Sequence, residues 1–414
     1  MTSNGPGAGK VVTTALVVTG NMVGAGILAL PVNLGPSGLI PALIGTVFMW
    51  FMMTCTALIY SRQKALIDDP DADLPTFFGR ELGPTGQWVS VAANIIILYG
   101  LLTAYLSGVA SIVINLFDLP IPEWGAMVGY FVIAVLLTSF GAAVMRRGNA
   151  ILMIFLWLCF AALVIMTIPN MHDGEIRLAD WSFLPSGLPV LLTAFHFHNI
   201  IPTLCHTLDN DHGAVTRAIW LGTGLGLIMN VIWIVVVVLA LPMTGNDGAN
   251  LIQAFQQNLP ATVPLAKVIG GNVFTQVSLG FAVVAMTTSF MANGTAMQSF
   301  MRDLVSTYLH SSNRTLVWAL SFLPPLAVGI LYPNVFLSAL NVAGGVGINI
   351  LFGILPGVLL IKYARGCGLE ADRGMGHDRG VRRRAAHRGR AGGRIAAHFS
   401  GCGILDRKAH TVRI

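Results

Sequence analysis

The stretch TALVVTGNMVGAGILALPVNLGPSG, residues 14–38, is the first hydrophobic segment of the chain. Gly20, Gly24 and Gly26 lie in its middle, and Pro31 follows them. Because glycine is a poor helix former and proline removes a backbone hydrogen bond, the pattern predicts a helix that unwinds at its centre. Unwound backbone at membrane depth is stable only where it lines a cavity or is buried in protein, so a ligand could meet free N–H and C=O groups here. The alternative is close helix packing through the GxxxG that Gly20 and Gly24 form.

The composition is that of a membrane protein. Of the 414 residues, 55% are hydrophobic and 10% are charged, whereas soluble domains carry roughly 25% charged residues. The 46 glycines and 20 prolines are tolerated in membrane helices, where neighbouring groups satisfy the freed backbone. We therefore predict an all-α, polytopic protein whose surroundings are the lipid bilayer. The first apolar run is long and glycine-rich and lacks a small-residue cleavage site, so we interpret it as a retained span rather than a cleaved signal.

Ten apolar segments are long enough to cross roughly 30 Å of hydrocarbon at about 1.5 Å per residue. They cover residues 11–34, 38–61, 87–115, 124–145, 150–169, 189–209, 217–242, 273–301, 315–332 and 335–361. The chain is thereby divided into an N-terminal segment over 1–10, a membrane core over 11–363 and a tail over 364–414.

Lysine and arginine are distributed unevenly between the two sets of connections, and the cytoplasmic side of a membrane protein keeps the excess. If the N-terminus is inside, only Arg177 and Lys267 fall outside. The inside set has eleven members: Lys10, Arg62, Lys64, Arg80, Arg146, Arg147, Arg217, Arg302, Arg314, Lys362 and Arg365. We therefore predict that the N-terminus and the start of the tail face the cytoplasm.

The net charge of +6 arises from the tail. Residues 366–414 hold eleven basic and four acidic side chains, a surplus of +7, and the other 365 residues hold thirteen basic and fourteen acidic ones, a balance of −1. Such a Gly- and Arg-rich tail cannot bury enough apolar surface to fold alone. We interpret it as a disordered or out-of-register C-terminus, such as a frameshift in a GC-rich gene would give. The alternative is a basic segment attracted to anionic lipid or nucleic acid.

The sixth apolar segment is interrupted as well. It reads LPVLLTAFHFHNIIPTLCHTLDND over residues 188–211 and places His196, His198, Asn199 and Pro202 in an apolar run. Polar groups at bilayer depth are costly unless they face a cavity or one another, so these residues mark a pathway. We expect no metal site, because two histidines two residues apart on a helix point about 200° away from each other and no carboxylate lies nearby.

Two broken segments at matching places predict an internal repeat. Segments one and six correspond if the chain consists of two five-helix halves, over about 11–169 and 189–361. An odd number of spans in each half inverts the second half across the membrane. This is the arrangement of secondary transporters, whose substrate sites lie between broken helices at the midplane.

Three stretches carry a resemblance to a known family: GNMVGAGILALP in the first span, FHFHNIIP in the sixth, and SFLPPLAVGILYPNVFLSALNVAG near spans nine and ten. Together they look like the bacterial hydroxy and aromatic amino acid permeases, a family of the amino acid/polyamine/organocation superfamily with tyrosine- and tryptophan-specific members. The resemblance covers about residues 11–363. It implies a five-plus-five inverted-repeat transporter in the bacterial inner membrane that imports an amino acid with protons. The family's usual eleventh span would fall in the tail, where the sequence has none.

An amino acid carrier of this kind has a binding site at the two breaks. We expect the substrate carboxylate at the positive end of a half-helix in span one, and the ammonium at carbonyls near the breaks. We expect the side chain between aromatic and polar groups, although packed tyrosine rings and ordinary interhelical hydrogen bonds are the alternatives. The predicted substrate-binding residues are Asn21, Val23, Gly24, Ala25, Gly26, Ile27, Tyr99, Tyr105, Phe195, His196, Phe197, His198, Asn199 and Asn341; Thr287 and Asn293 of span eight are further candidates.

The coupling ion is predicted from the titratable groups. His196 or His198 is the predicted proton carrier, since histidine titrates near neutral pH. Sodium is the alternative, with the hydroxyls of Thr288 and Ser289 as its ligands. We predict no catalytic residue, cofactor or nucleic-acid partner. A membrane-embedded enzyme would need a nucleophile or paired carboxylates, and a channel would show repeated pore-lining elements. The choice among tyrosine, tryptophan and hydroxy amino acids, and the oligomeric state, are left open.

Overall fold

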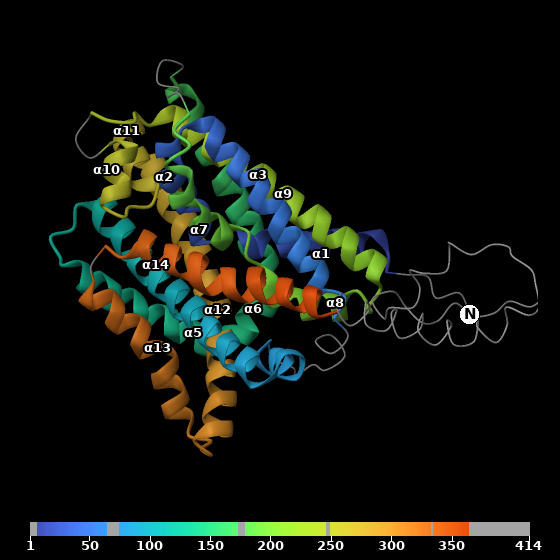
Figure 1. Cartoon of the computed structure of the whole chain (residues 1–414). Helices are drawn as coiled ribbons and strands as arrows, with labels where there is room; N and C mark the ends of the chain where they lie inside the picture. Colours follow the sequence, from blue (N-terminus) through green and yellow to red (C-terminus); the bar gives the residue numbers. More distant parts are fainter. Residues whose placement is uncertain (1–5, 64–73, 173–178, 246–248, 333, 364–414) are drawn as a thin grey trace, which may run out of the picture. The chain divides into compact units, whose positions relative to one another are not determined.

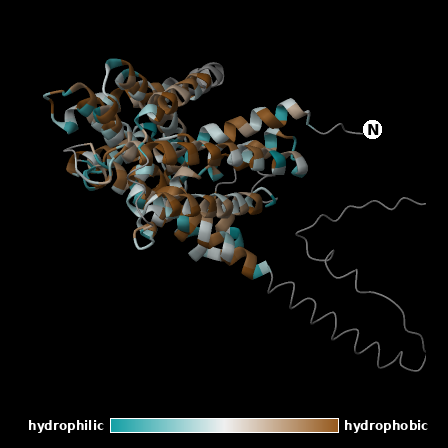
Figure 2. Ribbon diagram, turned by 90° about the horizontal axis from the view of Figure 1, so that it is seen from above, coloured by the Kyte–Doolittle hydropathy of each residue, from teal (hydrophilic) through white to brown (hydrophobic). Residues whose placement is uncertain are grey.

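A computed structural model describes residues 6–63, 74–172, 179–245, 249–332 and 334–363, and every regular element in these ranges is helical (Figure 1). The chain divides into two compact units, residues 1–353 and residues 354–414. The second unit is described only over 354–363, so the predicted tail lies outside the described residues. Hydrophobic residues predominate along the helices (Figure 2).

The first span is broken where the glycines predict it. Helix α1 (Ala8–Met22) is followed by Val23 and Gly24, which are not helical, and α2 (Ala25–Leu34) begins after them. The backbone of Gly24 has φ −147° and ψ −147°. The two helices are bent by 56° against each other. A 3₁₀ turn, η1 (Gly35–Ser37), then leads into α3 (Leu39–Tyr60). Together the two helices are long enough to cross a membrane, and the break falls in the middle of this span.

The sixth span is broken in the same manner. Helix α7 (Leu184–Ala194) ends at Phe195, and the chain resumes as a 3₁₀ turn, η4 (His198–Ile200), and α8 (Ile201–Thr207). Residues 195–197 between them have no regular helix. The interruption predicted from the histidines and proline is thus present.

The remaining elements form the frame around the two broken spans. They are α5 (Leu74–Phe117), which is kinked at Gly83, α6 (Glu123–Thr167), η2 (Ile168–Asn170), α9 (His212–Ala240), α10 (Leu251–Gln256), α11 (Thr262–Ile269), α12 (Asn272–Tyr308), α13 (Arg314–Leu331), α14 (Phe336–Val342) and the π-helical η5 (Ala343–Ile354).

The helices coincide with the ten predicted apolar segments. Among the described residues, seven helices are long and apolar enough to cross a membrane, and the bent pair α1 and α2 makes an eighth span. Two shorter apolar stretches, Glu123–Ser139 and Ile154–Asn170, occupy the other two segments. The structure joins these two segments in the one continuous helix α6, where the sequence predicted a connection. The protein is therefore a multi-pass membrane protein, while the number of crossings and the internal repeat stay predictions.

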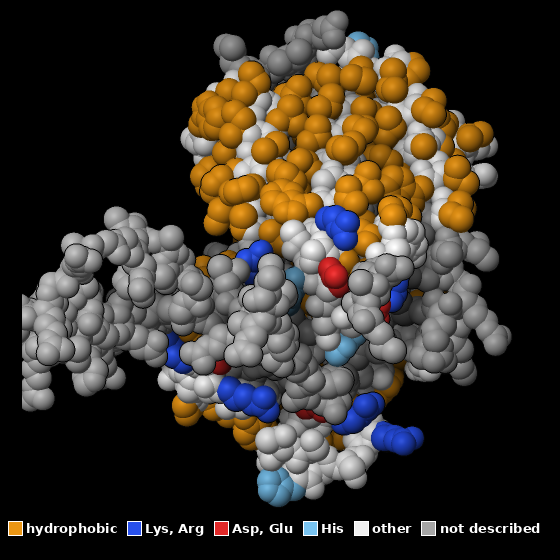
Figure 3. All heavy atoms as spheres, turned by 90° about the vertical axis from the view of Figure 1, so that its right-hand side faces the viewer, with side chains coloured by type: hydrophobic (Ala, Val, Ile, Leu, Met, Phe, Trp, Pro, Cys, Tyr) orange, Lys and Arg blue, Asp and Glu red, His pale blue; other side chains and the backbone are white. Residues whose placement is uncertain are grey.

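The described surface supports a lipid environment. Large apolar side chains are exposed on several helices, for example Phe48 on α3 at 57% and Ile228 on α9 at 55%. Figure 3 shows a broad area of such side chains with no charged group among them, and the charged side chains gather beside it. Exposed apolar area on this scale is unstable in water and is satisfied by acyl chains.

Small residues let the broken helices approach their neighbours. A methyl group on Gly222 of α9 would lie 2.5 Å from the carbonyl oxygen of Ala15 in α1, and the Thr19 hydroxyl donates to the Gly222 carbonyl at 2.8 Å. A methyl group on Gly26 of α2 would lie 2.8 Å from the Cα atom of Ala194 in α7. Each half of the first span is therefore held by direct backbone packing, and this packing fixes the position of the break.

Candidate functional site

The two breaks meet α5 and α12 around one small cavity. Its volume is about 20 Å³, so it admits water but no amino acid in this conformation. Its lining residues come from all four elements: Asn21, Met22, Gly24, Ala25, Gly26, Leu101, Tyr105, Thr193, His196, Asn199, Ser289 and Asn293. Every one of these side chains is uncharged when histidine is neutral.

The N-terminus of α2 borders this cavity through Gly24, Ala25 and Gly26. In any α-helix the N–H groups of the N-cap and first turn lack an intrahelical acceptor, and no side chain caps those of Gly24, Ala25, Gly26 and Ile27. Together with the helix dipole they make a site for an anion. The N–H of Val23 is different, because it donates to the carbonyls of Thr19 and Gly20 at 3.1 and 3.2 Å and so belongs to α1.

The wall opposite α2 is a network of polar side chains on α5 and α12. The Asn293 amide donates to the Tyr105 hydroxyl at 3.2 Å and to the Ser289 carbonyl at 3.0 Å. Ser289 faces Gly24 so closely that a methyl group there would lie 2.8 Å from its Oγ atom. The network therefore lies directly against the first break.

One hydrogen bond joins the two breaks. The Asn21 amide, at the end of α1, donates to the Asn199 side-chain oxygen in η4 at 3.3 Å. Both side chains line the cavity.

The two histidines lie on the second break in unequal positions. His196 lines the cavity, whereas His198 packs behind it with its Nε2 atom 2.9 Å from the Thr56 hydroxyl of α3. Their rings are nearly parallel, 6.2 Å apart, and both pack on Phe352. The prediction that they point about 200° apart is wrong, because it assumed a helix where the backbone is unwound. Among the described residues no group of three potential metal ligands occurs.

Other predicted residues lie outside the cavity. Tyr99 donates to the Leu320 carbonyl of α13 at 2.6 Å, and Thr288 donates to carbonyls of its own helix. Asn341 donates to the Asn33 side chain of α2 at 3.2 Å. The Thr287 hydroxyl is hydrogen-bonded to the Tyr130 hydroxyl at 3.1 Å. The remaining members of this group are in the core: Val23, Ile27, Phe195 and Phe197 are at most 5% exposed.

Sequence reasoning missed three lining residues, Met22, Leu101 and Thr193. Thr193 lies within one turn before the second break, where its hydroxyl donates to the Leu340 carbonyl at 3.1 Å. A threonine that close to a break was a usable signal. Met22 and Leu101 carry none, because apolar residues occur throughout the spans.

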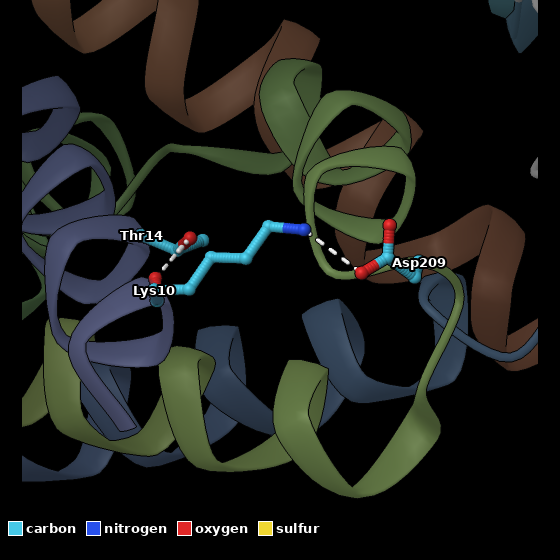
Figure 4. Close-up of polar contacts among 3 residues, drawn as sticks. All are labelled: Lys10, Thr14 and Asp209. Atoms are coloured by element: carbon cyan, nitrogen blue, oxygen red, sulfur yellow. Dashed lines mark hydrogen bonds and ion pairs between the residues drawn. The ribbon is translucent and has the colours of Figure 1, made fainter. Parts of the chain in front are cut away.

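An ion pair ties the two broken spans together at their far ends. The ammonium of Lys10, in the first turn of α1, lies 2.8 Å from the Asp209 carboxylate just after α8 (Figure 4). Both side chains are solvent-exposed, at 44% and 68%. The pair lies on the side that the charge distribution predicts to be cytoplasmic.

Comparison with known proteins gives a consistent result. The sequence pattern of the tryptophan/tyrosine permease family matches residues 8–368. The tyrosine-specific transport system 1 of Haemophilus influenzae is 28% identical over 81% of this chain and 84% of its own length, and the tryptophan-specific transport protein of the same organism is 24% identical over 85% and 87%. Among solved structures, Mhp1, described as a nucleobase-cation-symport-1 family transporter, has a TM-score of 0.57 over 88% of this chain and 82% of that chain at 14% identity. At that identity the likeness shows the fold alone.

Proposed function

The chain belongs to the tryptophan/tyrosine permease family, a family of transport proteins rather than enzymes, and on this basis we propose that it is a secondary active importer of an aromatic or hydroxy amino acid. Import proceeds by alternating access with proton symport. The protein lies in the bacterial inner membrane with its N-terminus in the cytoplasm.

One observation carries the proposal: the cavity at the two helix breaks has the groups that an amino acid backbone needs. The unpaired N–H groups of Gly24, Ala25 and Gly26 suit a carboxylate, because they combine donors with the positive end of a helix dipole. Carbonyls at the end of α1 and at the second break suit an ammonium group. The protein brings no formal charge to either contact, so the two charges of the zwitterion are stabilised by dipoles.

The cavity must open to accept its substrate. It is too small for an amino acid, and the Asn21–Asn199 contact crosses it. Rotation of the half-helices about their breaks would enlarge it from one side at a time. The exposed ion pair between Lys10 and Asp209 would have to separate for release into the cytoplasm.

His196 is the proton carrier in this proposal. It is a histidine that lines the cavity, and its Nε2 atom has no protein partner, so it can accept a proton beside the bound substrate. Sodium is the second candidate for coupling. The Ser289 hydroxyl beside the first break favours it, whereas the Thr288 hydroxyl is bonded within its own helix.

Uptake into proteoliposomes tests both parts. Labelled tyrosine and tryptophan should accumulate under an inward proton gradient without sodium, and serine or threonine should compete if hydroxy amino acids are carried. The variant His196→Gln should abolish proton-driven accumulation while leaving exchange across the membrane. His206→Gln, an exposed histidine on α8, is the control. Accumulation driven by sodium alone would overturn proton coupling and identify sodium as the coupling ion. Failure of every amino acid to compete would overturn the proposed function.

A further inference from the structure

Asn293 on α12 has an unused acceptor beside the cavity. Its side chain is 8% exposed and lines the cavity, and its Oδ1 atom is buried without a hydrogen-bond partner. A buried acceptor without a partner is rare in folded proteins, because it gives up its hydrogen bonds to water and forms none in the protein. One that faces a binding cavity is satisfied when a ligand brings a donor.

The orientation of this amide is fixed by chemistry. The Nδ2 group of Asn293 lies 3.0 Å from the Ser289 carbonyl oxygen, and a carbonyl can only accept. The nitrogen must therefore be on that side, and a flipped amide would place two acceptors together. The contact with the Tyr105 hydroxyl at 3.2 Å holds the group from a second direction. The free oxygen is consequently held in place before any ligand arrives.

The position of Asn293 points to the substrate's side chain rather than to its backbone. Ser289 lies against Gly24, at the donors proposed for the carboxylate. Asn293 is one helical turn further along α12, about 6 Å away. The carbonyls suited to the ammonium are on the broken helices, not on α12. The α5 and α12 wall is thus the part of the cavity left for the side chain.

We propose that Asn293, held by Tyr105 and Ser289, selects amino acids whose side chain carries a hydrogen-bond donor. The phenol O–H of tyrosine and the indole N–H of tryptophan, which both lie far from the amino acid backbone, can each donate to its Oδ1 atom. Phenylalanine cannot, and it leaves the acceptor buried and unpaired. A site built to bond a polar group discriminates strongly against an analogue that lacks it. This inference rests on the proposed function and narrows its substrate class.

Competition against labelled tyrosine uptake by the unaltered protein is the first test. Tyrosine should compete at least about tenfold better than phenylalanine and than O-methyltyrosine, which keeps the ring oxygen but has lost the donor. Tryptophan should likewise compete better than 1-methyltryptophan, in which the indole N–H is replaced by a methyl group. Equal competition by phenylalanine and tyrosine would overturn the inference although tyrosine is still carried. If no aromatic or hydroxy amino acid is carried, the proposed function itself fails.

The variant Asn293→Leu is the second test. The tyrosine-to-phenylalanine preference should fall toward one because tyrosine weakens and phenylalanine does not. Asn230→Leu is the matched control, since Asn230 on α9 is 2% exposed and also has an unpartnered Oδ1 atom, yet does not line the cavity; it should leave the preference unchanged. If Asn293→Leu weakens the competition by tyrosine and by phenylalanine equally, the inference is overturned, and Asn293 instead binds the substrate ammonium or supports the packing. The comparison of methylated substrates decides the matter if this variant does not fold.

Discussion

Adding one methyl group at Gly26 should separate the two broken spans. An alanine there would place its Cβ atom 2.8 Å from the Ala194 Cα and 3.1 Å from the Ala194 backbone nitrogen. Carbon atoms rest about 3.5–4.0 Å apart, so α2 and α7 would have to move apart by about 0.7–1.2 Å. Overpacking of this kind costs roughly 1–3 kcal/mol. A shift of about 1 Å in groups that hold a substrate costs on the order of 100-fold in enzymes, and we expect a loss of uptake of similar order for Gly26→Ala.

Two other glycines make this prediction specific. In Gly24→Ala the methyl group meets only the Ser289 hydroxyl, at 2.8 Å, and this flexible group can turn away, so the thermal midpoint in detergent should hold while KM for tyrosine rises. In Gly224→Ala the methyl group meets nothing within 4 Å, and helix propensity should stabilise the protein by up to about 1 kcal/mol. Thermal denaturation and tyrosine uptake are measured for all three variants. An unchanged midpoint and KM for Gly26→Ala would refute the close packing of α2 on α7.

Three further outcomes are expected. Removing the ion pair in Lys10→Ala or Asp209→Ala should favour the cytoplasm-open form by at most about 1 kcal/mol, because the pair is exposed. The rate at which a single cysteine placed beside the pair is labelled should therefore rise at low salt. The charge exchange Lys10→Asp with Asp209→Lys should restore the original labelling rate. Thr56→Val removes the partner of the His198 Nε2 atom and should destabilise the protein by about 1–3 kcal/mol in a denaturation assay, whereas a stability equal to that of the unaltered protein would show that this contact is not formed. Tyr99→Phe should leave uptake kinetics unchanged, since Tyr99 bonds to α13 outside the cavity, and a changed KM would contradict its position.

The breaks themselves were readable from the sequence because each has a local cause. Gly24 and its neighbours lower helix propensity at one point of an apolar run, and a polar FHFHN stretch interrupts the other. These signals depend on residues close in sequence, and the structure shows both breaks at those residues. Nine residues predicted for the site accordingly line the cavity: Asn21, Gly24, Ala25, Gly26, Tyr105, His196, Asn199, Ser289 and Asn293.

Side-chain direction was harder to predict, because it depends on how each helix is rotated. Tyr99 and Tyr105 are six residues apart on α5, so at about 100° per residue they point to different sides, and sequence alone does not say which side faces the cavity. The structure places Tyr105 there and Tyr99 against α13. Asn341 is a second case, because its partner Asn33 is 308 positions away in sequence. The relative direction of His196 and His198 was predicted wrongly for a different reason: helical geometry was applied to a segment whose backbone is unwound.

The uncharged lining of the cavity has an electrical consequence. A zwitterionic amino acid adds no net charge to a pocket of amides, hydroxyls and backbone dipoles. In the proposed symport, the carrier loaded with one monovalent cation would therefore cross with a charge of +1 and the empty carrier would return neutral. The membrane potential then acts on the loaded step alone, with about 2.3 kcal/mol per 100 mV. Inside-negative voltage should therefore draw substrate inward even where the ion has no concentration gradient. Transport would register as an inward current that grows with substrate and reverses with the sign of the voltage.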